Sequence, residues 1–158
     1  MDPIFKKLNF KDHKNILVVN APESFQLNME AMSGFTRFFL RPEELAELEF
    51  ALVFATRQEE INAYASLIAP KLKGDAILWF CYPKGTSKKY ACDFNRDTGW
   101  AIMGNFGLEP VRMVAIDEDW SALRFRKVAY IKTITRSEKM ALTDEAKKRT
   151  TKKPFSTD

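Results

Sequence analysis

The chain has 158 residues, the length of one ordinary domain, and its 46% hydrophobic and 29% charged residues exclude a disordered or fibrous protein. No apolar run approaches the about 20 residues that a membrane helix needs. Charged residues occupy the N-terminal positions where an export signal needs an apolar stretch. We therefore expect a cytoplasmic protein with no membrane partner. Residues 1–131 hold as many basic as acidic side chains, so the formal net charge of +4 lies entirely in residues 132–158, which argues against a basic domain face for nucleic acid.

The first elements form a strand followed by a helix. Residues 15–20, NILVVN, are apolar and rich in β-branched side chains, which predicts a strand. Pro22 suits the first turn of a helix, where its missing N–H has no partner to lose. That helix would place three apolar side chains inward, Phe25, Met29 and Met32. A second strand is expected over residues 35–40.

A stronger strand and helix unit comes next. Residues 50–55, FALVFA, are apolar at every position, which is typical of a parallel strand covered on both faces. Thr56 and Glu59 form a T-x-x-E capping box for the helix that follows. Residues 76–82, AILWFCY, form another apolar run after a crossover of the length that parallel strands need. We therefore predict that the strands at 15–20, 50–55 and 76–82 are parallel and central in the sheet.

The last elements predict a helix and a hairpin. Residues 93–106 carry apolar side chains at helical spacing and end before a glycine. Residues 111–116 and 120–128 are strand-like runs joined by an acidic turn, the pattern of an antiparallel hairpin. Together the elements predict an α/β fold of three layers, with a mostly parallel central sheet and a C-terminal antiparallel hairpin.

One domain accounts for this pattern. We expect it to span residues 1–131, with an N-terminal segment at 1–14 and a core at about 15–128. Residues 132–158 have little periodicity and read as a basic, flexible tail.

Three segments resemble a known family: ILVVNAPESF at 16–25, ILWFCYPKGTSKKYACDFNRD at 77–97 and VAIDEDWSALRFR at 114–126. They are similar to small bacterial proteins grouped as domain-of-unknown-function family 3052. The resemblance implies an α/β fold and carries no activity with it. The matching positions are Trp79, Pro83, Lys84, Asp93, Asn95, Arg96, Asp97, Trp120 and Ser121.

The order of elements is also similar to the second half of Rossmann-like methyltransferases, whose sheet ends in a reversed hairpin. Those enzymes have a glycine-rich turn after their first strand, so that the backbone can approach the cofactor. Here that turn reads VVNAPESF and contains no glycine. The sequence therefore predicts no nucleotide cofactor.

The chain has little to offer for acid–base or metal chemistry. Its one histidine, His13, lies in a charged segment before the first strand, which excludes a histidine triad or a zinc site in the core. Cys81 and Cys92 have neither disulfide-scaffold nor metal-ligand spacing, so two reduced thiols are expected. We predict no metal and no cofactor.

The loop PKGTSKK, residues 83–89, follows a predicted buried strand, at the edge of the sheet where α/β proteins bind ligands. Thr86 and Ser87 offer hydroxyls, and Lys84 and Lys88 offer positive charge. This composition predicts a site for a phosphate, a nucleotide or an acidic peptide. In the structural alternative, Lys84 pairs with Asp93 or Asp97 and only ties the loop to its helix.

Other polar residues near strand ends complete the candidate ligand site: Asp93, Arg96 and Asn20. Asp93 and Asn20 also suit a helix start, where carboxylates and amides cap free N–H groups, whereas Arg96 could clamp a carboxylate or phosphate. We expect a binding domain more than a self-sufficient enzyme, with an anionic small molecule or an acidic partner as its ligand. Two alternatives stay open: a group-transfer enzyme that uses Lys84, Asp93 and Arg96 without histidine, and a protein-interaction module with a vestigial crevice.

Overall fold

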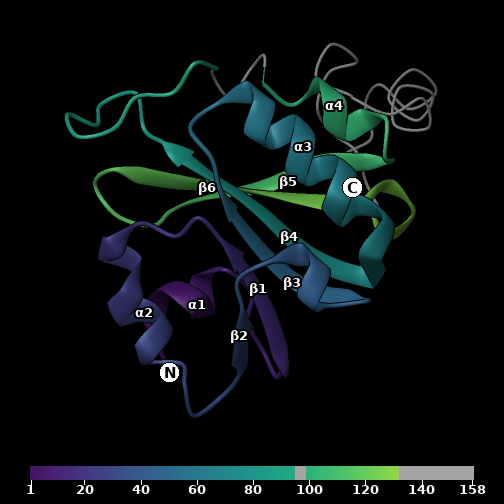
Figure 1. The fold of residues 1–158 in the computed structure, drawn as a ribbon, viewed down its shortest axis with the longest axis horizontal. Helices are drawn as coiled ribbons and strands as arrows, with labels where there is room; N and C mark the ends of the chain where they lie inside the picture. The colour runs from purple at the N-terminus through teal and green to yellow at the C-terminus, as the bar shows by residue number, and fades with distance from the viewer. Residues whose placement is uncertain (95–98, 132–158) are drawn as a thin grey trace.

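A computed structural model describes residues 1–94 and 99–131, in which one six-stranded sheet is covered by helices on both faces (Figure 1). Helices α1 and α2 lie on one face, and α3 and α4 lie on the other. The strands are β1 (Asn15–Val19), β2 (Arg37–Phe39), β3 (Leu48–Phe54), β4 (Leu72–Pro83), β5 (Leu108–Ala115) and β6 (Trp120–Lys127). The helices are α1 (Pro3–Lys7), α2 (Gln26–Glu30), α3 (Gln58–Ile68) and α4 (Ala101–Gly104).

The strand order β2-β1-β3-β4-β6-β5 confirms the predicted fold class. Strands β1, β3 and β4 are parallel and interior, as their apolar runs predict. Strand β2 extends the sheet in parallel beside β1, and β6 pairs antiparallel with both β4 and β5. The C-terminal hairpin therefore closes one side of a mostly parallel sheet.

Strand β4 shows how the sheet separates two apolar layers. Its side chains alternate, so Phe80 packs with the layer under α3 while Trp79 packs with the layer under α1. Both side chains are fully buried. The indole Nε1 of Trp79 donates a hydrogen bond to the Leu8 carbonyl at 2.9 Å. This bond ties the N-terminal segment to the sheet, so the segment is part of the core.

The capping box of α3 is one residue later than predicted. The Glu60 carboxylate, not that of Glu59, accepts from the Thr56 and Arg57 amides at 2.9 and 3.1 Å. Glu59 instead pairs with the Arg57 side chain at the surface. The helix begins at Gln58, so Glu60 is its third residue and is the one that can reach back to the free amides.

Three helices differ from the sequence prediction. The helix after β1 is a 3₁₀ turn at Glu23–Phe25 followed by the short α2, and α1 was not predicted. The Asp2 carboxylate caps α1 by accepting from the Ile4 and Phe5 amides. In the described part of 93–106, the α-helix covers Ala101–Gly104.

The predictions for residues 95–98 and for the tail at 132–158 lie outside the described residues. Within residues 1–94 and 99–131, no helix is long and apolar enough to cross a membrane.

Candidate functional site

The chain places β2 on one side of β1 and all later strands on the other side, beginning with β3. The neighbouring parallel strands β1 and β3 therefore form the topological switch point of the sheet. In open α/β sheets, the crevice outside the carboxyl ends of two such strands is the usual place for a ligand. A cavity of about 240 Å³ lies there. The residues that line this switch-point cavity include Asn20, Phe54, Thr56, Glu60, Tyr90 and Trp120.

Asn20, directly after β1, has a left-handed backbone with φ of 58°. That conformation costs most L-residues about 1–2 kcal/mol, whereas glycine adopts it freely and asparagine tolerates it. Asn9 is the other non-glycine residue with positive φ in the described part of the chain. The sequence shows no glycine at this turn, yet the backbone takes a shape for which glycine is normally used.

Aromatic rings form one wall of the switch-point cavity. The Trp120 ring centroid lies 5.2 Å from that of Phe54, with the rings nearly perpendicular, and 4.9 Å from that of Tyr90. Trp120 is 3% exposed. Its indole Nε1 is buried without a hydrogen-bond acceptor among residues 1–94 and 99–131. A buried donor of this kind usually has a partner.

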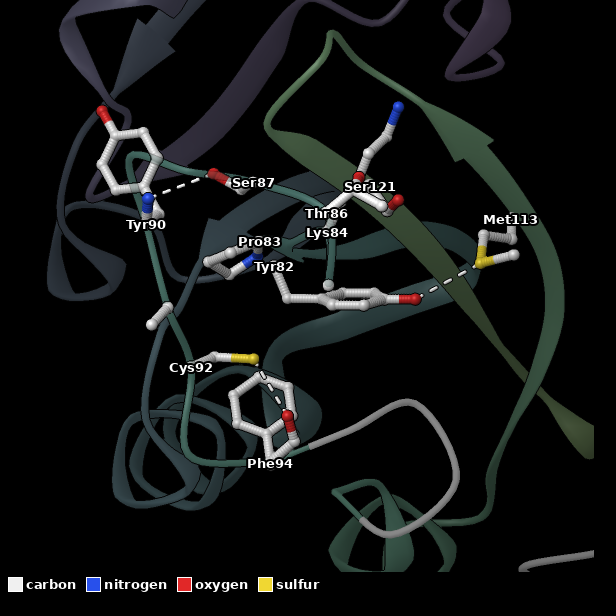
Figure 2. A pocket seen from close by; sticks show the side chains of 12 residues that line it. Tyr82, Pro83, Lys84, Thr86, Ser87, Tyr90, Cys92, Phe94, Met113 and Ser121 are labelled. Carbon is white, nitrogen blue, oxygen red and sulfur yellow. Dashed lines mark hydrogen bonds between the residues drawn. The ribbon is translucent and has the colours of Figure 1, made fainter.

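A larger cavity of about 590 Å³ lies beside the first, where β4 ends and β6 begins (Figure 2). Among the residues that the structure describes, Tyr90 is the one that lines both cavities. Its backbone is fixed, because its amide donates to Ser87 Oγ at 3.1 Å while Ser87 Oγ donates to Asp119 Oδ1 at 2.8 Å. Tyr90 is thus the described residue at which the two cavities adjoin, and we call it the partition between them.

The predicted ligand residues do not all lie at one cavity. Asn20 lines the switch-point cavity, and three loop residues line the larger one: Lys84, Thr86 and Ser87. Lys88 and Asp93 line neither cavity, and Arg96 is outside the described residues. A ligand role for these seven side chains stays a prediction.

Asp93 and Lys84 have structural partners. The Asp93 carboxylate accepts from the Gln58 amide at 2.7 Å, so it caps the start of α3. The Lys84 amide donates to the Asp119 carbonyl at 2.8 Å. In the part of the chain that the structure describes, no ion pair joins Lys84 to Asp93. The loop is tied to the β5–β6 turn through Asp119.

The thiols and the histidine do not supply a nucleophile or a base at either cavity. Burial raises the pKa of the Cys81 thiol well above its ordinary value, which keeps it protonated. The Cys92 thiol donates to the Phe94 carbonyl at 2.9 Å. His13 stacks its ring edge-on against Phe50, and burial lowers its pKa.

Sequence reasoning missed the aromatic lining of the larger cavity. Tyr82, Tyr90 and Phe94 all line it, and Met113 lies opposite on β5. Tyr82 was expected only as the end of a buried strand, and Tyr90 was overlooked beside the lysines. The available signal was a tyrosine on each side of the polar loop.

No family model matches the chain, and no curated protein matches it either. Among solved structures, an S-adenosylmethionine-dependent methyltransferase from Aquifex aeolicus superposes with a TM-score of 0.54 at 12% identity, covering 79% of this chain and 88% of that one. The pyocyanin biosynthetic protein PhzM gives a TM-score of 0.53 at 9% identity, covering 79% of this chain and 53% of that one. The chain therefore has a methyltransferase fold of the Rossmann-like type.

These likenesses correct the predicted function. The interpretation as an anion-binding module with an acidic partner is wrong, because the shared fold belongs to proteins that depend on a nucleoside-derived small molecule. The alternative of a protein-interaction module is set aside with it. The group of Lys84, Asp93 and Arg96 is not assembled in the described residues, since Lys84 lines the larger cavity and Asp93 does not.

Proposed function

We propose that this chain binds a nucleoside-derived small molecule of the S-adenosylmethionine class in the crevice at the carboxyl ends of β1 and β3. One observation carries the proposal: the left-handed turn at Asn20 lies beside a cavity at the switch point of a methyltransferase fold. In this conformation the chain turns sharply as it leaves the strand. This is the backbone shape that a close approach to a ligand requires.

The side chains around this cavity suit a nucleoside. Phe54 and Trp120 offer aromatic surface against which a purine packs. The free Trp120 Nε1 would donate to a ring nitrogen or to a ribose oxygen. The Glu60 carboxylate, held in place by the Thr56 and Arg57 amides, would accept from ribose hydroxyls.

The size of the cavities indicates how such a ligand would be held. Small-molecule sites usually occupy about 300–1,000 Å³, and the switch-point cavity of about 240 Å³ is below that range. The neighbouring cavity of about 590 Å³ is within it. A nucleoside with an amino-acid side chain would therefore extend past Tyr90 from one cavity into the other.

The lack of a histidine base is compatible with this function. S-adenosylmethionine, when bound, supplies an activated methyl group on a sulfonium centre. The protein then contributes mainly by holding the two reactants in line and by excluding water. The resemblance to family 3052, which no family model supports, stays a prediction beside this proposal.

Isothermal titration calorimetry with S-adenosylhomocysteine and S-adenosylmethionine tests the proposal. We expect saturable binding of either nucleoside and none of free methionine, because the purine and ribose carry the contacts. An Asn20→Gly variant keeps the left-handed turn and should bind at least as well as the parent chain. Absence of measurable heat with both nucleosides at millimolar concentration would show that the fold is present without this ligand.

A further inference from the structure

The larger cavity has an apolar side and a polar side. Figure 2 shows Cys92 and Phe94 on one side of Tyr82, and Lys84, Thr86 and Ser121 together on the other. The Tyr82 and Phe94 ring centroids are 6.1 Å apart. Tyr82 Oη donates to the Met113 sulfur at 3.3 Å, which brings the thioether over the cavity from the edge strand β5. The cavity is therefore an aromatic and thioether surface with hydroxyls and an ammonium along one rim.

We propose that this cavity binds a flat aromatic small molecule that carries a hydroxyl or carbonyl oxygen. Its volume of about 590 Å³ is within the range of small-molecule sites. Among the described residues, only Tyr90 lines both this site and the switch-point cavity. A nucleoside that extended past Tyr90 would occupy part of the same cavity, so the site is tested on the chain without nucleoside.

The apolar side accounts for the flat ring. Aromatic pairs prefer tilted or offset contacts, and the walls at Tyr82, Tyr90 and Phe94 present such surfaces. The Met113 side chain is 47% exposed and borders the same cavity. Thioether sulfur makes favourable contacts with aromatic rings, so a flat ligand would cover Met113 better than a puckered one.

The polar side of the cavity is the reason why we propose a ligand with an uncharged oxygen. Lys84 offers only donors, and the Thr86 and Ser121 hydroxyls can donate as well, so the matching ligand atom is an acceptor. Ser87 contributes less, because its hydroxyl is engaged with Asp119 and with the Tyr90 amide. The Asp119 carboxylate, which accepts from Ser87 at this rim, offsets the charge of the Lys84 ammonium, so a neutral hydroxyl or carbonyl oxygen is the ligand group that we propose.

The test uses the apo chain with ¹³C-methyl-labelled methionine and three probes: 2-naphthol, naphthalene and decahydro-2-naphthol. We expect 2-naphthol to bind most tightly and to shift the Met113 methyl resonance by ring current. Met29 and Met32 pack in the layer on the other face of the sheet, so their methyl resonances should not move. Their response is the internal control for non-specific binding.

Two variants distinguish the contribution of the ligand's aromatic ring to affinity from the contribution of its oxygen. Thr86→Val, at an exposed position, should weaken 2-naphthol by roughly three- to tenfold, as loss of one hydrogen bond does, and should leave naphthalene unchanged. Met113→Ala should weaken both aromatic probes. Equal affinity for decahydro-2-naphthol and 2-naphthol, or shifts at Met29 or Met32 without a shift at Met113, would overturn the proposal. Failure of nucleoside titration would not affect this result, because no nucleoside is present.

Discussion

Replacing Tyr90 by alanine should join the two cavities and strengthen nucleoside binding. Within residues 1–94 and 99–131, Tyr90 alone lines both the cavity of about 240 Å³ and the cavity of about 590 Å³. In the parent chain, a ligand that spans both must move the ring away from Trp120, whose centroid is 4.9 Å away. An aromatic pair of this kind is worth about 0.5–1.5 kcal/mol. Without that cost, affinity for S-adenosylhomocysteine should rise roughly three- to tenfold.

The assay is calorimetric titration of S-adenosylhomocysteine into the parent chain and three variants. Tyr90→Phe should match the parent, because the ring makes the contact with Trp120. Tyr130→Ala removes an exposed tyrosine that lines neither cavity and should also match the parent. Unfolding in urea should show that Tyr90→Ala loses about 1 kcal/mol of stability and still folds.

The possible outcomes distinguish the role of Tyr90 as a partition from the existence of the nucleoside site. Binding by Tyr90→Ala but not by the parent would mean that the partition is normally closed. Equal or weaker binding by Tyr90→Ala would refute the role of Tyr90 and leave the nucleoside site in place. Absence of binding by both proteins would refute the site itself.

Three further predictions concern single residues. Asn20→Ala should lower the free energy of unfolding by about 1 kcal/mol, whereas Asn20→Gly should not, because only alanine is strained at a φ of 58°; equal urea midpoints would contradict this. The pKa of His13 is lowered from 6.5 by burial, so the unfolded chain binds more protons and stability should fall as pH drops below 6.5; a His13→Gln variant should lose less stability between pH 7.5 and 5.5, and an identical loss would exclude His13 as the cause. A thiol reagent should modify Cys92 in the folded chain but not Cys81, which is fully buried; mass spectrometry of the labelled peptides checks this, and prompt labelling of Cys81 would mean that β4 opens readily.

The sequence predicts the central strands of the sheet because each of them is a continuous apolar run that can be recognised without knowledge of distant contacts. Residues 50–55 and 76–82 are apolar at every position, and only a strand covered on both faces buries such a run. The hairpin follows from two strand-like runs around the acidic turn Asp117–Asp119. The switch point between β1 and β3 then follows from the order of elements, so the edge of the sheet with the ligand crevice was predictable.

The site itself depends on contacts between distant residues. Ser87 donates to Asp119, 32 positions later, and accepts from the amide of Tyr90, whose ring lies beside Trp120. Composition made the lysines of the same loop prominent, yet Lys88 lines neither cavity. The left-handed turn at Asn20 is likewise set by the fold, because asparagine adopts both left- and right-handed backbones.

The indole resonances of the three tryptophans give the most direct test of nucleoside binding at the carboxyl ends of β1 and β3. In a ¹H–¹⁵N spectrum titrated with S-adenosylhomocysteine, the Nε1–H signal of Trp120 should move downfield as its free donor gains an acceptor. The Trp79 signal, whose donor already bonds the Leu8 carbonyl, should stay in place. A Trp120 signal that does not move at saturating ligand, or at millimolar ligand without saturation, would contradict the proposed site.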